Sequence, residues 1–328
     1  MATVVLAGGG TAGHIEPALA VARQWVKTNP SDSCIFLGTK SGLENTLVPA
    51  AGFELRLIPK VVISRTPSAS WLRIPADLIS SVLSSLKVIK KADVLVGFGG
   101  YVSAPAYLAA ALSRTPIVIH EANAKPGWAN RLGAAFSEHL AVAHPVDSGK
   151  FEHALLAGLP LRSDVAQAFK DSESDWTTAR RAAKLRLGFA ADAPLIFIMG
   201  GSQGSVAINN VISSVVSMFN EKSLSVLHSV GKLNALPQAT GGYKPVAYVD
   251  AMADAYLAAD LIIGRSGAVT CSEFRALGRY ALFVPLPIGN GEQFVNAASL
   301  VADNRAEVIT QKDFTSAFLH SQMAGLLA

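Results

Sequence analysis

The sequence contains few cysteines and no long apolar run. Of its 328 residues only Cys34 and Cys271 are cysteines, each inside an apolar segment, so we expect no disulfide framework and a reducing, cytoplasmic setting. No stretch of about 18 uncharged apolar residues is present, which argues against a membrane-spanning helix. Met1 and Ala2 lead directly into an apolar run without a signal-peptide pattern, which also favours the cytoplasm.

Aromatic residues are scarce as well, at 7% of the chain, whereas half of the residues are apolar. This mixture is typical of α/β layers with buried parallel strands rather than of a β-sandwich. The length is sufficient for two domains that each bury a core of their own.

The formal charge of +4 is unevenly distributed. Residues 1–162 contain 15 Lys and Arg against 10 Asp and Glu, or +5, and the remaining residues contain 13 against 14, or −1. A basic first half could attract phosphate, anionic lipid or nucleic acid, or it could be ordinary solvated surface. Nucleic acid is not favoured, because aromatic residues do not interleave with the basic ones.

Both halves of the chain begin with the same pattern. A short apolar run from Thr3 to Ala7 precedes GGGTAGH and the helical pattern IEPALAVARQW, and near residue 195 LIFIMG precedes GSQGS and VAINNVISSVVSMF. Strand, glycine loop and helix in this order predict an α/β fold of two Rossmann-like, doubly wound domains facing a cleft. We place the boundary near 158–162, which gives domains 1–162 and 163–328.

Further elements follow from local periodicity and turn residues. The Gly- and Pro-rich segments 240–245 and 285–292 are typical of loops, and the polar segment Lys170–Ala183 is expected on the surface. A helix is expected over Leu78–Lys91. Strands are expected at Cys34–Leu37, Val94–Val96, Pro116–Ile119, Ser225–His228, Pro245–Tyr248, Leu261–Ile263 and Ala281–Val284.

The first glycine loop fits the G-x-G-x-x-G spacing of a dinucleotide site. Such a site also requires an acidic residue at the end of the second strand to bind the ribose. Here that strand ends Leu37-Gly38-Thr39-Lys40, and Glu44 lies further into the next segment. NAD binding is therefore not favoured.

Four glycine loops that each follow a strand are more informative than one. They begin at Gly8, Gly97, Gly200 and Gly264. Together they would place several helix N-termini, which attract anions, at the carboxyl edges of the sheets. The alternative is that each glycine only closes a turn.

The segment from Ser266 to Glu273 adds a chemical detail. A helix starting near Ser266 would direct free N–H groups at a diphosphate, and Glu273 two turns further on could accept hydrogen bonds from a ribose. The alternative is a surface glutamate without a role. Since no Asp-x-Asp pair is present, we expect the helix end rather than a metal ion to bind the diphosphate, and no cofactor.

Several motifs in one order resemble the MurG family of bacterial glycosyltransferases over almost the whole chain. They are GGGTAGHIEPALAVA, GFGGYVSAPAYLAA, HEANAKPGWANRL, GGSQGS, YVDAMADAYLAADLIIGRSGAVTCSEF and ALFVPLPIGNGEQFVNA. The resemblance implies a GT-B fold and inverting transfer of N-acetylglucosamine from UDP-N-acetylglucosamine. The acceptor would be the C4 hydroxyl of MurNAc in undecaprenyl-pyrophosphoryl-MurNAc-pentapeptide, which converts lipid I to lipid II in peptidoglycan synthesis.

The resemblance also implies a peripheral protein on the cytoplasmic face of the bacterial cell membrane. Its partners would be UDP-N-acetylglucosamine, the lipid-linked acceptor, an anionic membrane surface and other cell-wall synthesis proteins, without nucleic acid. Residues 1–162 would form the acceptor and membrane-associated domain, and residues 163–328 the donor domain.

Carried over residue by residue, the family's contacts with the UDP-sugar donor fall on both halves. Many members read Thr-Gly-Gly where this chain has Thr-Ala-Gly, and some read Gln-Gln where it has Glu292-Gln293. This chain also ends earlier, so we expect its last helix to be incomplete. The implied contacts are Thr11, Ala12, Gly13, Asn123, Arg162, Ser202, Val249, Ala268, Val269, Thr270, Cys271, Ser272, Glu273 and Gln293.

His14, at the end of the first glycine loop, is the candidate general base. An imidazole can take a hydroxyl proton near neutral pH, and the resemblance indicates the same residue. The alternatives are His120 or Glu121 as the base, and a structural role for His14 at the helix start. Arg162 and the Ser266–Thr270 helix start would stabilise the leaving UDP.

A lipid acceptor requires membrane contact. Apolar residues at three- and four-residue intervals between 61 and 91, with basic residues among them, describe an amphipathic helix. Since Leu78–Ile89 is expected to pack on the sheet, the preceding Trp71, Leu72 and Ile74 are the membrane candidates.

Two other functions remain open from the sequence. A UDP-N-acetylglucosamine 2-epimerase would share the donor site but needs several acid and base carboxylates, of which the motifs offer few beyond Glu121, Glu273 and Glu292. A non-catalytic nucleotide-sugar-binding subunit would keep the loops but would not need His14.

Overall fold

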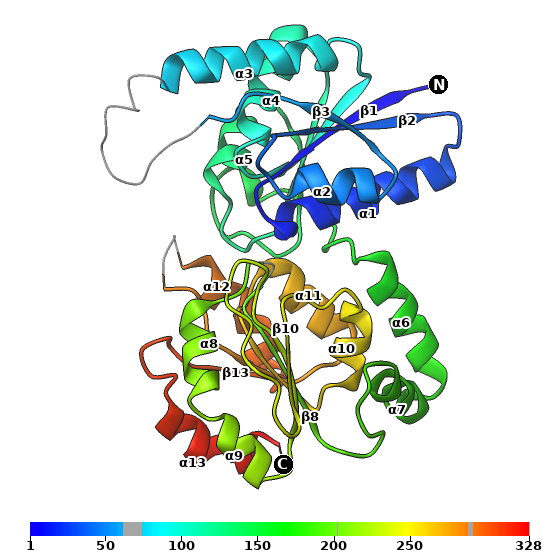
Figure 1. Cartoon of the computed structure of the whole chain (residues 1–328). Coiled ribbons are helices and arrows are strands. Elements are labelled where there is room, and N and C mark those ends of the chain that lie inside the picture. Colours follow the sequence, from blue (N-terminus) through cyan, green and yellow to red (C-terminus); the bar gives the residue numbers. More distant parts are fainter. Residues whose placement is uncertain (62–73, 202, 288–290, 328) are drawn as a thin grey trace. The chain divides into compact units, whose positions relative to one another are not determined.

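The computed structural model describes residues 1–61, 74–201, 203–287 and 291–327. The chain divides into two compact units, Met1–Arg162 (unit 1) and Ser163–Ala328 (unit 2), and each unit is built around one sheet (Figure 1). None of the helices in the described ranges is both long and apolar enough to cross a membrane.

Unit 1 contains a seven-stranded sheet in the order β3-β2-β1-β4-β5-β6-β7, whose neighbouring strands all run parallel. Helices cover both of its faces (Figure 1). The elements are β1 (Thr3–Gly8), α1 (Ala12–Thr28), β2 (Ser33–Gly38), α2 (Glu44–Ala50), β3 (Glu54–Leu57), α3 (Ile74–Ile89), β4 (Val94–Gly99), α4 (Ser103–Ser113), β5 (Ile117–Glu121), α5 (Trp128–Gly133), β6 (His139–Val142), a short 3-10 turn (Gly149–Phe151) and β7 (Leu155–Leu156).

The central strand β1 is buried on both faces, which explains its continuous apolar sequence. Val4 and Leu6 pack with α1 and α2, whereas Val5 and Ala7 pack with α3 and α4. Because successive side chains of a strand point to opposite faces, one short apolar segment serves two cores.

Unit 2 repeats this plan with six parallel strands in the order β10-β9-β8-β11-β12-β13. The prediction of two Rossmann-like α/β domains is therefore confirmed. The elements are α6 (Ser163–Ser174), α7 (Trp176–Arg186), β8 (Leu195–Met199), α8 (Val206–Ser213), α9 (Val216–Glu221), β9 (Ser225–Ser229), β10 (Tyr243–Val246), α10 (Met252–Ala258), β11 (Leu261–Gly264), α11 (Ala268–Ala276), β12 (Ala281–Phe283), α12 (Glu292–Ala302), β13 (Ala306–Val308) and α13 (Ser316–Leu326).

The strand predicted at Pro245–Tyr248 was placed too late. β10 starts at the buried Tyr243, directly after a glycine turn in which Gly241 has a φ of 54°, so the loop predicted at 240–245 is also wrong in its second half. Strands β3, β6, β7 and β13 were not predicted, because they are edge or near-edge strands with two to four residues and exposed positions.

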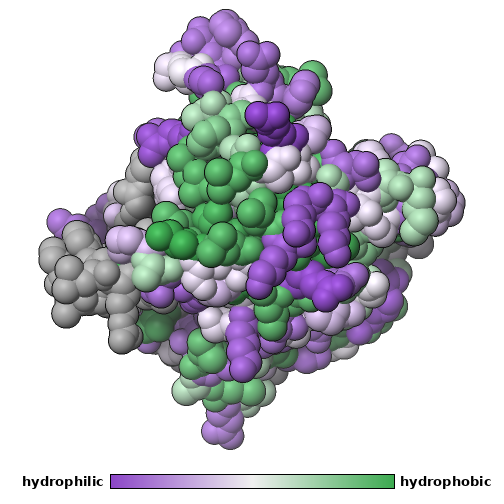
Figure 2. Space-filling view, turned by 90° about the horizontal axis from the view of Figure 1, so that it is seen from above, coloured by the Kyte–Doolittle hydropathy of each residue, from purple (hydrophilic) through white to green (hydrophobic). Residues whose placement is uncertain are grey.

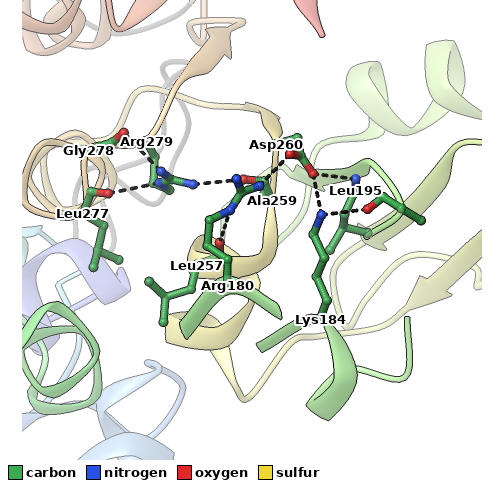
Figure 3. Close-up of polar contacts among 10 residues, drawn as sticks. Arg180, Lys184, Leu195, Leu257, Ala259, Asp260, Leu277, Gly278 and Arg279 are labelled. Carbon is green, nitrogen blue, oxygen red and sulfur yellow. Dashed lines mark hydrogen bonds and ion pairs between the residues drawn. The ribbon is translucent and has the colours of Figure 1, made fainter. Parts of the chain in front are cut away.

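Polar contacts at the amino edge of the unit 2 sheet connect α7 to two strands (Figure 3). Asp260, just before β11, accepts hydrogen bonds from Arg180, from Lys184 at 2.9 Å and from the Leu195 amide at 2.9 Å. Although burial opposes the shift, these donors lower the pKa of Asp260. The cluster stabilises the edge opposite the glycine loops.

Candidate functional site

The four glycine loops follow the two central strands of each sheet. Those of unit 1 come after β1 and β4, and those of unit 2 come after β8 and β11. Strand order reverses between these pairs, and ligands of open α/β sheets bind where the order reverses, at the carboxyl ends of the strands. Each unit therefore has a candidate ligand-binding edge that consists of two glycine loops.

In unit 1 the imidazole of His14 lies between both loops. Its Nδ1 atom is 3.2 Å from Oγ1 of Thr11, the residue that precedes α1. A Cβ atom on Gly100 would lie 3.2 Å from that Nδ1 atom and only 2.2 Å from the carbonyl oxygen of Gly9. Glycine at position 100, with a φ of 81°, therefore lets the second loop approach both the first loop and the ring.

Burial lowers the pKa of His14, and the Glu121 carboxylate opposes this effect. A lowered pKa keeps the imidazole neutral at neutral pH, so that a ring nitrogen can accept a proton. His14 also contacts Thr11 at the start of its own helix. The residue therefore has both the neutral state that a general base needs and a structural contact at the helix start, which was the alternative role for His14.

Glu121 and His120, the two alternative candidates for the general base, already make hydrogen bonds within the fold. Glu121 uses both carboxylate oxygens: Oε1 accepts from the amide and side chain of Asn123, and Oε2 accepts from the amide of Gly127 and from Asn130. His120 is buried, its Nε2 lies 2.7 Å from the Gly158 carbonyl oxygen, and burial lowers its pKa. These contacts favour His14 as the base.

In unit 2 helix α11 starts at Ala268, two residues later than the predicted Ser266. Its N-cap is Gly267, which has no side chain to accept a hydrogen bond, and the helical ladder begins with the Cys271 amide bonded to the Gly267 carbonyl. Just before it, the fully buried Ser266 hydroxyl has no hydrogen-bond partner among the described residues. The amides of Ala268 to Thr270 are therefore suited to an anion.

Helices α7, α8 and α13 of unit 2 have side-chain caps, whereas α9, α10 and α12 lack one, as α11 does. Ser205 accepts from the Ile208 amide at the start of α8, Asp175 from Thr178 at α7, and Thr315 from Phe318 at α13. A cap satisfies part of the N–H groups that a ligand would otherwise bind. Helix α11 thus differs from the three capped helices at the edge where a nucleotide is expected.

The side chains of α11 differ in how far they are buried. Glu273 is only 1% exposed, so the alternative of a surface glutamate is wrong. Cys271 is also buried, and burial raises the pKa of its thiol to about 12, which makes the thiol a packing group. Ala268 is buried and so, elsewhere in unit 2, is Val249; Val269, Thr270 and Ser272 are partly buried.

Arg265 is the residue of this site to which the sequence analysis gave no role. Its buried guanidinium donates to the Val284 and Pro285 carbonyls, to the Ser205 hydroxyl and to Gln311. These partners are all neutral. The Arg265 guanidinium therefore connects the two glycine loops of unit 2, and no carboxylate among these partners neutralises its positive charge. The sequence signal that could have indicated this role is an arginine directly after a strand that ends in glycine.

The remaining predicted contacts are partly described. Gln293 accepts from the Leu286 amide at 2.9 Å through Oε1, and no hydrogen bond of its NH₂ group to another described residue is present. Thr11 is exposed, and Ala12, Gly13 and Arg162 are partly buried. Ser202, Trp71 and Leu72 lie outside the described residues. Among the residues that are described, no group of three or more His, Cys, Asp or Glu could hold a metal ion.

Helix α3 packs on the sheet side of unit 1 as expected, through the buried Val82 and Ile89. Its buried face also contains Ser81 and Ser85, and the helix lies against the alanine-rich α4. Ile79 and Leu83 are instead 60% and 53% exposed. Ile74 is the first residue of the helix rather than part of the segment before it. Apolar side chains gather on the face of unit 1 that includes α3, bordered by hydrophilic ones (Figure 2).

Residues 4–142 match the glycosyltransferase family 28 N-terminal domain, and residues 195–328 match the C-terminal domain of the same family. The chain is also 44% identical to a Paenarthrobacter aurescens protein and 41% identical to one from Streptomyces coelicolor. Each comparison covers 99% of this chain, and 87% and 89% of those proteins. Both are named UDP-N-acetylglucosamine–N-acetylmuramyl-(pentapeptide) pyrophosphoryl-undecaprenol N-acetylglucosamine transferase.

Among solved structures, the chain is similar to MurG of Acinetobacter baumannii, with a TM-score of 0.72, 28% identity, and coverage of 100% of this chain and 91% of that one. A UDP-GlcNAc 2-epimerase from Neisseria meningitidis has a TM-score of 0.59 at 15% identity, with 99% and 92% coverage, and shows the fold alone. The chain belongs to the MurG family of N-acetylglucosamine transferases within glycosyltransferase family 28.

Proposed function

We propose that the protein transfers N-acetylglucosamine from UDP-N-acetylglucosamine to the C4 hydroxyl of MurNAc in undecaprenyl-pyrophosphoryl-MurNAc-pentapeptide, with inversion. The observation that carries this proposal is identity above 40% over 99% of the chain to transferases named for this reaction. The product, lipid II, is a precursor of peptidoglycan.

Unit 2 supplies the donor site in this proposal. The N–H groups of Ala268, Val269 and Thr270 bind the diphosphate, and the positive end of α11 and the Arg265 charge stabilise it. Glu273, one and a half turns into the helix, binds the ribose hydroxyls, and the side-chain N–H groups of Gln293 bind the sugar. Asn123, Arg162 and Ser202 complete the donor contacts that the family resemblance implies.

Inverting transfer needs a base and a stabilised leaving group. His14, neutral because burial lowers its pKa, takes the proton of the C4 hydroxyl as that oxygen attacks the anomeric carbon. The bond from the anomeric carbon to the diphosphate oxygen breaks, and UDP leaves with the electron pair. The developing negative charge on UDP is stabilised by the start of α11.

One assay tests the function. Labelled UDP-N-acetylglucosamine is supplied with and without the lipid-linked acceptor, and we expect UDP release and label in lipid only with acceptor. Conversion of the sugar without acceptor would instead support an epimerase, and binding without turnover a non-catalytic subunit. Neither alternative is favoured, because the relatives above 40% identity are transferases and the epimerase likeness lies at 15%.

We further propose that unit 1 contacts the cytoplasmic face of the membrane peripherally. The outer side of α3 presents the exposed Ile79 and Leu83. The exposed Lys87 follows one turn later, and the exposed Lys90 comes directly after the helix. Apolar side chains followed by lysines suit insertion beside anionic headgroups. Trp71, Leu72 and Ile74, which precede or begin this helix, extend the proposed contact.

Co-sedimentation with vesicles tests this contact. Replacing Ile79 and Leu83 together with Ser should release the protein from phosphatidylglycerol vesicles, whereas the same change at the exposed Leu155 and Leu156 of β7 should not. The triple change of Trp71, Leu72 and Ile74 to Ser should also release it. Unchanged binding of both α3-region variants would reject the membrane contact.

A further inference from the structure

Glu44 is a buried acidic residue that the proposed chemistry does not use. It begins α2 and is 0% exposed. No ion pair between described residues includes it. A buried carboxylate without a cationic partner is stable only if hydrogen-bond donors surround it.

The donors come from three different loops. Oε1 of Glu44 accepts from the Thr39 amide at 2.9 Å, from the Thr39 hydroxyl at 3.1 Å and from the Tyr101 hydroxyl at 3.1 Å. Oε2 accepts from the Gly10 amide at 3.1 Å. One side chain thus connects the first glycine loop, the turn after β2 and the second glycine loop.

Glycines around Glu44 make room for these contacts. A Cβ atom on Gly42 would lie 2.1 Å from the carboxylate, and one on Gly38 would lie 2.4 Å from the Glu44 Cγ atom. A Cβ atom on Gly10 would lie 2.6 Å from the Tyr101 ring. The local backbone is therefore compatible with one buried carboxylate and one aromatic ring at this place.

The contact with Gly10 changes what the first loop can do. In a dinucleotide site the amides of such a loop approach the diphosphate. Here the Gly10 amide is already bonded to a carboxylate, which would repel a phosphate at the same place. The loop is instead fixed next to Thr11 and His14, and Tyr101 fixes the second loop on the other side of the His14 ring.

We propose that Glu44 is a positioning residue that holds the two glycine loops of unit 1 around His14. The proposal rests on the proposed function, in which His14 is the general base. Glu44 acts through the loops and does not touch the reacting atoms.

Glu44→Gln is a sharp test because both carboxylate oxygens face a backbone N–H. Whichever way the new amide turns, its NH₂ group meets the amide of Thr39 or of Gly10, donor against donor. We expect kcat to fall by roughly 10- to 100-fold through misplacement of His14. The KM for UDP-N-acetylglucosamine should change less than kcat, because the donor contacts of unit 2 are not altered.

Asp32→Asn is the matched control. Asp32 also bridges two N–H donors, the Ala2 amide at 2.7 Å and the Trp25 indole at 3.1 Å, but at the other end of β1. We expect this variant to lose stability and to keep kcat within about twofold. A purely structural role of Glu44 would make the two variants alike.

Histidine NMR supplies a measurement that needs no substrate. In protein labelled at histidine Cε1, the His14 signal is identified by its loss in His14→Ala and followed against pH. Burial is the main cause that lowers this pKa, whereas Glu121 on β5 and a hydrogen bond with the backbone of Gly9 in the first loop raise it. Loosened loops would change both the burial and the Gly9 contact, so we expect the His14 pKa to shift by about half a unit or more in Glu44→Gln and not in Asp32→Asn.

The outcomes distinguish the positioning role of Glu44 from the proposed transferase function. A shifted His14 titration in a protein without transferase activity would support positioning by Glu44 and reject the proposed function. A folded Glu44→Gln protein with wild-type kcat and titration would overturn the positioning role. If Glu44→Gln does not fold, Tyr101→Phe, which removes one hydroxyl contact, must show a smaller change of the same sign, and no change would overturn the proposal as well.

Discussion

The two units share one architecture, but the groups that hold their glycine loops have opposite charge. In unit 1 the loops around His14 are held by the carboxylate of Glu44. In unit 2 the corresponding loops are connected by the guanidinium of Arg265, whose partners are neutral. The same fold can thus prepare one edge for a neutral base and another for an anionic nucleotide.

The difference also shows that the net charge of each half did not predict the charge next to its glycine loops. By sequence the first half is basic, at +5, and the second is slightly acidic, at −1. At the loops the order is reversed, because a charge within a few ångströms in a buried place outweighs many screened surface charges. The following predictions test this contrast, from the largest effect to the smallest.

Removing the base of unit 1 should have the largest effect. His14→Ala should lower kcat by roughly 10²- to 10⁴-fold with a nearly unchanged donor KM, because only proton transfer is lost. The measurement is acceptor-dependent UDP release. His139→Ala, at an exposed position of β6, is the control, and a His14 variant with most of its turnover would exclude His14 as base.

Removing the carboxylate of α11 should act on the donor instead. Glu273→Ala should raise the KM for UDP-N-acetylglucosamine by roughly 10- to 100-fold, the effect of losing hydrogen bonds to a charged group. Initial rates at varied donor concentration measure it. An unchanged KM would remove Glu273 from the donor site.

Unit 2 should be acid-sensitive through a residue near its first glycine loop. His228 is buried, with Nδ1 2.8 Å from the Tyr243 hydroxyl and Nε2 3.1 Å from Oδ1 of Asn209 on α8. Burial lowers the pKa of His228 to about 4, against about 6.5 in the unfolded chain. Because the unfolded state then binds more protons, stability is present above pH 6.5 and is lost as pH falls towards 4.

The expected loss between pH 7 and pH 5 is about 2 kcal/mol, equal to roughly 30-fold in the folding equilibrium. Denaturant unfolding at both pH values measures it. His228→Gln, which cannot titrate, should have a flatter pH dependence over this interval. Equal slopes for both proteins would show that His228 does not titrate in this way.

Replacing Arg265, the buried cation beside the glycine loops of unit 2, should have the smallest effect, a loss of affinity for UDP. Arg265→Met should weaken UDP binding by about tenfold, because the charge beside the loops is lost, and Arg265→Lys should retain part of the affinity. Arg279→Met is the control, since that partly buried arginine also donates to backbone carbonyls but at the opposite edge of the sheet (Figure 3). Calorimetric titration with UDP measures both, and equal losses would contradict the contrast between the units.

Local sequence determined the fold class and the positions of the glycine loops. Strands such as Val4–Ala7 of β1 and Leu195–Met199 are apolar because both faces are buried, and glycine follows them where the backbone turns sharply. Short edge strands such as Leu155–Leu156 have no such pattern and were missed. The order of the motifs also predicted the family, which the comparisons confirm.

Only the tertiary structure decided which side chains act together. The roles of Glu44 and Arg265 depend on partners 57 and 60 residues away, in loops that no local pattern connects. Which face of α3 is buried likewise depended on its alanine-rich neighbour α4. The buried face includes Ser81 and Ser85, and Ile79 and Leu83 remain exposed. Periodicity predicts a helix face, but packing against a particular partner decides which face is buried.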